Sequence, residues 1–179
     1  MATGRKNKLV GQAGEYLVCA QLAKRGFMAT PFAGNVPVFD VLIADDQCRS
    51  VAIQVKASTG LQWRTDARLW LSMDFDPVAS RQIYNGPLDL AMPDLLTVCV
   101  SLDMGGTNDR YFILTARAIQ ERVIKGYTWW MSQRDWKRPK NPQSYDSRFD
   151  VNDLEPFENR WELIADRLGG SPSCVTLTT

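Results

Sequence analysis

Two neighbouring apolar runs, each interrupted by polar side chains, constrain the fold of this chain most strongly. The first run, Val38–Ile43, contains Asp40, and the second, Val51–Lys56, contains Gln54 and Lys56. Both runs are rich in β-branched residues, which is typical of buried β-strands. A carboxylate, an amide or an ammonium group inside such a strand lowers stability unless it finds a partner. The polar positions therefore indicate a shared site.

A short polar loop between the two runs predicts a β-hairpin, with strands over 37–44 and 50–57 and the loop over 45–49. If Ala44 lies opposite Ser50 in an antiparallel pair, Asp40 lies directly opposite Gln54. Side chains opposite each other on one face have Cβ atoms roughly 5 Å apart. Lys56 then points to the same face as Gln54, because strand side chains alternate. A shift of one residue would place Asp40 and Gln54 on opposite faces.

The remaining sequence predicts further helices and strands around this hairpin. We expect a helix over 7–25 that ends at Gly26, a strand over 27–32 and a turn over 33–35. Later strands are expected over 69–75, 95–102 and 110–114, and irregular segments over 76–93 and 127–152. One further helix is expected over 116–125, capped by Thr115 and ended by Gly126, and another over 155–168, capped by Asp153 and ended by Gly169. This order predicts an α/β fold with a central mixed sheet flanked by helices, as a single domain over 1–169 with a flexible tail over 170–179.

The composition excludes several classes of site. The chain has no histidine, which excludes His-based triads, HNH and HD hydrolases, HExxH proteases and His-ligated zinc. Its four cysteines form no CxxC pair, and neither a membrane-spanning run nor a secretory signal is visible, so we expect a reduced cytoplasmic setting. The formal net charge of +1 is too balanced to argue for nucleic-acid binding by itself.

The polar strand residues could act together with an acid on the first helix. Glu15 shares one stripe of that helix with apolar residues, so it is expected to face protein. Oxygen atoms of Glu15, Asp40 and Gln54 would suit Mg²⁺ or Mn²⁺, which prefer oxygen ligands. Lys56 would orient a metal-bound water or stabilise charge on a phosphate. The predicted catalytic residues are therefore Asp40, Gln54, Lys56 and Glu15, and the predicted reaction is phosphodiester hydrolysis.

At these residues the chain resembles the PD-(D/E)xK nuclease superfamily, which has the restriction-endonuclease-like fold. The resemblance covers about residues 8–58. It places the helix acid at Glu15 in Gly11-Gln12-Ala13-Gly14-Glu15, the strand aspartate at Asp40, and the acid-x-Lys element at Gln54-Val55-Lys56. Gln54 departs from the usual Asp or Glu and is similar to the Gln-x-Lys variant of Mrr-like restriction enzymes and some intron homing endonucleases. The resemblance implies a Mg²⁺-dependent endonuclease acting on DNA.

Basic and aromatic residues offer candidate contacts to nucleic acid. Aromatic rings can stack on bases and cations neutralise phosphates. The candidates come from the N-terminal residues and from a loop near 136–140: Arg5, Lys6, Lys8, Trp136, Lys137, Arg138 and Lys140. The alternative is that the tryptophans of this region, Trp129, Trp130 and Trp136, pack the loop onto the domain while the charges stay solvated.

Other interpretations of the strand residues stay open. The chain could be a nuclease-fold protein that binds nucleic acid or a protein without cutting, because Gln54 supplies no charge. The polar residues could also be structural: Glu15 in a surface ion pair, Asp40 capping a turn, and Lys56 extending to solvent at a strand end. DNA is the expected partner, while RNA as substrate and pairing of two chains remain open.

Overall fold

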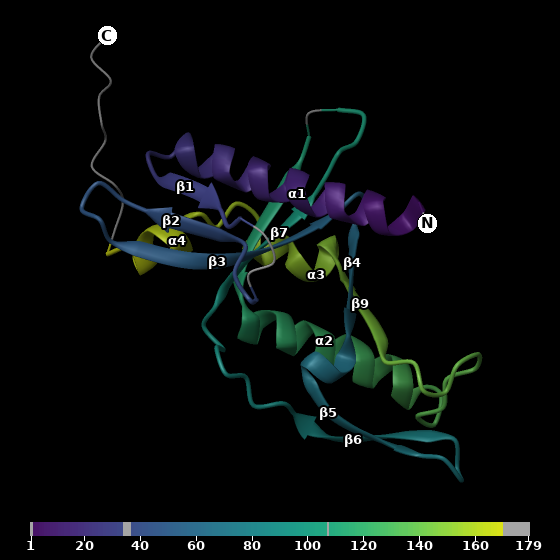
Figure 1. Ribbon diagram of the computed structural model, residues 1–179. Coiled ribbons are helices and arrows are strands. Elements are labelled where there is room, and N and C mark those ends of the chain that lie inside the picture. The colour runs from purple at the N-terminus through teal and green to yellow at the C-terminus, as the bar shows by residue number, and fades with distance from the viewer. Residues whose placement is uncertain (1, 34–36, 107, 170–179) are drawn as a thin grey trace. The chain divides into compact units, whose positions relative to one another are not determined.

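The computed structural model describes residues 2–33, 37–106 and 108–169, and its chain forms two compact units (Figure 1). Unit 1 comprises Met1–Leu61, Leu95–Leu114 and Leu154–Thr179, and unit 2 comprises Gln62–Asp94 and Thr115–Asp153. The expected single domain over 1–169 includes both units. The expected tail over 170–179 lies outside the described residues.

Unit 1 is built on a mixed five-stranded sheet. Its elements are α1 (Ala2–Ala23), β1 (Met28–Pro31), β2 (Val41–Ala44), β3 (Ser50–Ser58), β7 (Leu96–Ser101), β8 (Arg110–Thr115), the 3-10 helix η2 (Glu155–Phe157) and α4 (Glu162–Arg167). The strand order is β1-β2-β3-β7-β8. β1, β2 and β3 pair antiparallel, whereas β3 and β7 pair parallel. The expected α/β fold with a central mixed sheet is confirmed.

The predicted hairpin register is also confirmed. Ala44 pairs with Ser50 and Val41 with Ile53, as the loop geometry predicted. This register places alternate side chains of β2 and β3 in the apolar core, and Val41, Ile43 and Ile53 have no solvent exposure. The hairpin is therefore fixed by burial, because a one-residue shift of β3 against β2 would turn Ile53 out of the core.

Helix α1 lies along the strands β1 to β3 and packs closely on β3 (Figure 1). Gly14 is buried, and a Cβ atom built on it would lie 2.5 Å from the Cβ atom of Ala57. Val18 and Leu22, one and two turns further along, have no solvent exposure and join the core of the sheet. The helix ends at Ala23 rather than at residue 25, and Gly26, in the turn that follows, has the positive φ of 86° expected for a glycine stop.

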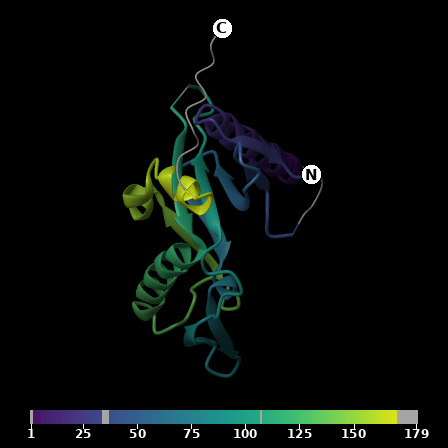
Figure 2. The same cartoon turned by 90° about the vertical axis from the view of Figure 1, so that its left-hand side faces the viewer.

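Unit 2 contains two small antiparallel sheets and a long helix. Its elements are β4 (Gln62–Asp66), the 3-10 helix η1 (Ala67–Leu69), β5 (Leu71–Asp76), β6 (Arg81–Pro87), α2 (Ala116–Ser132), β9 (Asp146–Asp150) and α3 (Val151–Leu154, which ends in unit 1). β4 pairs with β9 and β5 with β6. Helix α2 lies against β9 (Figure 2). The rings of Trp63 and Phe149 stack across β4 and β9 with centroids 5.8 Å apart.

Several expected elements have other bounds. Helix α1 begins at Ala2 rather than at residue 7, and β2 begins at Val41 rather than at residue 37. Helix α2 continues through Gly126 to Ser132, because Tyr127 and Met131 extend its buried stripe. The segments 76–93 and 127–152, expected to be irregular, contain β6 and β9. The expected helix over 155–168 is interrupted, with Asn159 at a φ of 56°.

Candidate functional site

Strand β3 changes its partner next to the predicted site residues. Its antiparallel ladder with β2 covers residues 50–53, and its parallel ladder with β7 covers residues 54–58. Gln54 is the first residue of the second ladder, and Lys56 follows two residues later. The strand therefore leaves β2 at the point where the Gln54-Val55-Lys56 element begins. We call this point the fork.

Asp40 lies at the fork and is held by three hydrogen bonds. Its backbone N–H donates to Ile53 O at 2.9 Å, and its backbone carbonyl accepts from Phe32 N at 2.9 Å. Its carboxylate oxygen Oδ2 accepts from the backbone N–H of Val55 at 2.7 Å. Because Val55 lies between Gln54 and Lys56 in the sequence, these bonds bring the carboxylate to the edge of β3 beside both residues.

This geometry differs in one respect from the expected cross-strand pair. The β2–β3 ladder ends at Val41 and Ile53, so Asp40 and Gln54 are not a ladder pair. The Asp40 carboxylate instead binds a backbone amide, and such bonds lie roughly in the plane of the sheet. Val38, two residues earlier, has a φ of 78°, which is rare for a β-branched residue and marks a strained turn into the site.

Gln54 and Lys56 point to the face of the sheet opposite α1. Ala57 and Val55 contact Gly14 of α1, and side chains alternate along a strand, so Gln54 and Lys56 face the other way. The register places Lys56 beside Cys99 of β7. Burial raises the pKa of the Cys99 thiol to about 12, and the positive charge of Lys56 opposes this shift. The ammonium group of Lys56 is therefore close to the buried thiol.

Glu15 approaches Asp40 from α1. The side chain is partly buried next to Gly14, where the helix lies closest to β3. Burial and, to a smaller extent, the negative charge of Asp40 raise the pKa of Glu15 above its ordinary value of 4.5. Two carboxylates thus repel each other at the fork, and a cation between them would relieve this repulsion.

The donor atoms at the fork fit a hard divalent cation in their chemistry. Glu15 and Asp40 supply carboxylate oxygens and Gln54 supplies an amide oxygen, which are ligand types of Mg²⁺ and Mn²⁺. Across residues 2–33, 37–106 and 108–169, no group of three or more cysteine, aspartate or glutamate side chains could hold a metal ion. The predicted set is not brought onto one face, because Glu15 comes from α1 and Gln54 points away from α1. A site at the fork would therefore depend on Asp40, Gln54 and water.

The residues predicted to contact nucleic acid lie in different surroundings. Arg5, Lys6 and Lys8 are exposed on the first turns of α1, and Lys137 and Lys140 are exposed in unit 2. The ring of Trp136 stacks on Tyr84 of β6 with centroids 5.9 Å apart. Trp136 thus packs its loop onto β6, as the alternative interpretation proposed, while Arg138 lines a pocket in unit 2.

Comparison with known proteins identifies no relative. No family model matches the chain, and no curated protein and no solved structure matches it. None of the described helices is long and apolar enough to cross a membrane.

Proposed function

We propose that this chain is a Mg²⁺- or Mn²⁺-dependent endonuclease that hydrolyses phosphodiester bonds in DNA at the fork of β3. One observation carries this proposal: the Asp40 carboxylate binds the amide of Val55 at 2.7 Å, between Gln54 and Lys56. Asp40, Gln54, Lys56 and Glu15 are the proposed catalytic residues.

The chain's own residues would divide the work by charge. Asp40 and Gln54 would hold the divalent ion through oxygen atoms, and Glu15, which approaches Asp40 from α1, would act as a supporting acid. When bound, such an ion lowers the pKa of a coordinated water and offsets charge on the phosphate. Lys56 carries the only positive charge of the four and would orient the attacking water or stabilise the phosphate oxygens.

The order of elements supports a restriction-endonuclease-like fold for unit 1. Helix α1 with Glu15 is followed by β1, by β2 directly after Asp40, and by β3 with Gln54 and Lys56. This is the order on which the resemblance to the PD-(D/E)xK superfamily depends. The parallel strand β7 beside β3 extends the sheet on the side away from β2.

A second function is favoured by the charge of the site. Gln54 is neutral, and Asp40 commits one carboxylate oxygen to the Val55 amide. A site with two carboxylates binds a divalent cation less tightly than a site with three. The second candidate is therefore a catalytically inactive protein of this fold that binds nucleic acid or a protein partner.

The two candidates are separated by a plasmid assay. Purified chain is incubated with supercoiled DNA in Mg²⁺, Mn²⁺ or EDTA, next to the variants Asp40→Asn and Lys56→Ala. Lys24→Ala, an exposed lysine near the end of α1, is the matched control for charge removal. Metal-dependent cutting by the wild type and by the control alone supports the nuclease. DNA binding by the wild type without cutting in either metal contradicts it and supports the second candidate.

A further inference from the structure

Unit 2 contains a pocket that the proposed nuclease site does not use. Its volume is about 500 Å³, within the range of roughly 300–1,000 Å³ typical of small-ligand sites. Helix α2, strand β9 and the loop before β9 form its walls. Six side chains carry its chemistry: Tyr127, Trp129, Trp130, Arg138, Asp146 and Arg148.

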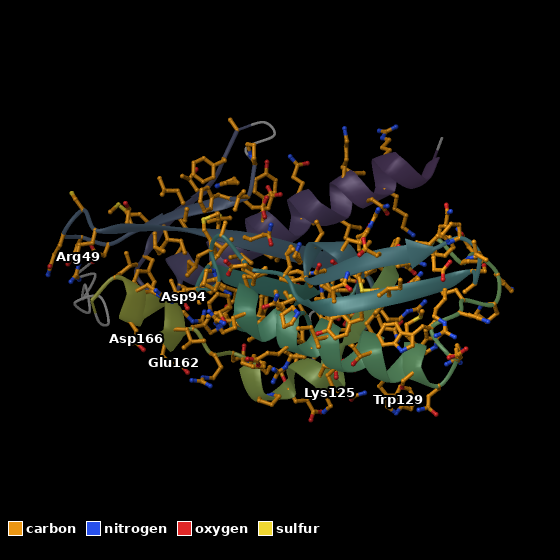
Figure 3. All side chains as sticks on the ribbon, turned by 90° about the horizontal axis from the view of Figure 1, so that it is seen from below. Arg49, Asp94, Lys125, Trp129, Glu162 and Asp166 are labelled. Carbon is orange, nitrogen blue, oxygen red and sulfur yellow. The ribbon has the colours of Figure 1, made fainter. Side chains whose placement is uncertain are left out.

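Aromatic rings from α2 give the pocket flat apolar walls. Trp129 is 65 % exposed, which is unusual for the largest apolar side chain. It projects from the same side of α2 as Lys125, one turn earlier (Figure 3). Tyr127 is buried, so its ring is fixed in the wall. The exposed ring of Trp129 offers a surface on which a planar ligand can stack.

Arginine side chains are held against these rings. The guanidinium of Arg138 lies 5.0 Å from the centroid of Trp130 and 5.5 Å from that of Tyr127. Its Nε atom is buried and has no hydrogen-bond partner within the described part of the chain. The guanidinium of Arg134 lies 4.1 Å from the centroid of Trp130. Because the Nη2 atom of Arg138 donates to the backbone carbonyl of Asp146, the guanidinium is held in the wall of the pocket.

The arrangement of charges on β4 and β9 favours an anion. Arg148 lies directly opposite Arg64 in the antiparallel ladder, and like charges in such a pair are destabilising. Between 134 and 148 the sequence has five cations and two acids. Both acids already form ion pairs: Asp146 with Arg64 at 3.0 Å and Asp135 with Arg81 at 3.0 Å. The remaining cations can therefore attract a phosphate.

We infer that this pocket binds an unpaired nucleobase together with its phosphate, as a nucleotide within single-stranded nucleic acid. The base stacks on Trp129, and the phosphate contacts Arg148. Aromatic walls distinguish this ligand from an acidic peptide, which would need the cations alone. Stacking suits any base, since every base has a flat π face. This inference concerns binding by unit 2 and does not depend on hydrolysis at the fork.

The test measures binding of a fluorescein-labelled oligothymidine by fluorescence anisotropy in EDTA, so that no metal-dependent cutting occurs. Trp129→Ala is expected to weaken binding roughly 5- to 150-fold, the range that stacking of one base gives. Arg148→Gln is expected to weaken binding and to reduce the slope of log affinity against log salt concentration by about 1, the contribution of one phosphate contact. Tyr16→Ala, an exposed aromatic residue of α1 in unit 1, is the matched control and should bind as the wild type does.

Three results would overturn the inference. One is unchanged affinity in Trp129→Ala that retains the wild-type circular dichroism and melting temperature. The second is that a DNA duplex of the same length binds more tightly than the single strand. The third is absence of oligonucleotide binding. If an acidic peptide such as polyglutamate binds instead, the pocket would have a protein partner. Because binding is measured in EDTA, its result does not depend on cutting, which separates this test from that of the nuclease.

Discussion

Replacing Gly14 with alanine tests the close packing that brings α1, and with it Glu15, to strand β3. Alanine is preferred over glycine in a helix by about 0.8–1.0 kcal/mol, so the substitution alone should stabilise α1. The new Cβ atom, however, would lie 2.5 Å from Ala57 Cβ, whereas carbon atoms in contact are normally about 3.5–4.0 Å apart. Both atoms are fixed to backbone, so the overlap of about 1 Å is relieved only when α1 moves away from β3.

The magnitude follows from the two opposing effects. Overpacking of this kind costs about 1–3 kcal/mol, which offsets or exceeds the helix-propensity gain. We therefore expect Gly14→Ala to change the free energy of unfolding by between about 0 and −2 kcal/mol. Gly11→Ala on the same helix is the matched control, because a Cβ atom there meets nothing within 4 Å. The control should gain up to about 1 kcal/mol.

Urea unfolding followed by far-UV circular dichroism measures both variants, with Ala57→Gly added to Gly14→Ala as a double-mutant cycle. The coupling between Gly14 and Ala57 should be about 1–3 kcal/mol, since removing the Ala57 methyl group relieves the overlap. Gly14→Ala should also raise the Mg²⁺ concentration needed for cutting, because Glu15 moves with the helix. Equal stability of Gly14→Ala and Gly11→Ala, with no coupling to Ala57, would refute the reasoning.

Three further predictions concern single side chains. The raised pKa of Glu15 means that its ionised form destabilises the fold, so stability falls as the pH rises above about 4.5. The melting temperature of Glu15→Gln should therefore exceed that of the wild type at about pH 8 and equal it near pH 4. Val38 has a φ of 78°, which glycine adopts more readily than valine, so Val38→Gly should preserve the free energy of unfolding in urea or raise it by up to about 1 kcal/mol. The control Val78→Gly, at another turn valine, should not raise it. Thiol labelling of the folded chain at neutral pH should modify exposed Cys48 but not Cys99, because Cys99 is buried and its pKa is raised to about 12. Rapid labelling of Cys99 would contradict its burial.

The hairpin could be predicted from sequence because two physical signals agree there. The apolar alternation of Val41, Ile43 and Ile53 and the short polar loop both require one register. Strands β4, β6 and β9 gave no such signal, because few of their residues are buried and β6 contains a glycine and a proline. Their apolar contacts depend on partners distant in sequence, such as Trp63 and Phe149, which stack although they are 86 positions apart.

The proximity of Asp40 to the Gln54-Val55-Lys56 element could be predicted from the sequence, but the geometry of the contact could not. The sequence pattern brings Asp40 to the Gln54-Val55-Lys56 element, and the structure agrees. Sequence periodicity extended β2 through Asp40, whereas the turn at Val38 ends the ladder at Val41 and leaves the carboxylate to bind the Val55 amide. A backbone donor has no signature in side-chain patterns, so this contact was missed. The pocket beside Trp129 was missed because β9 was not expected to pair.

The central claim is that oxygen atoms of Asp40 and Gln54 hold a divalent ion that is needed for cutting. The most direct measurement is the Mg²⁺ concentration that gives half-maximal plasmid cutting by the wild type, Gln54→Glu and Gln54→Ala. The added charge of Gln54→Glu should lower this concentration about tenfold or more, equivalent to about 1.4 kcal/mol, and Gln54→Ala should raise it. Equal Mg²⁺ dependence in all three proteins, or cutting that persists in EDTA, would contradict it.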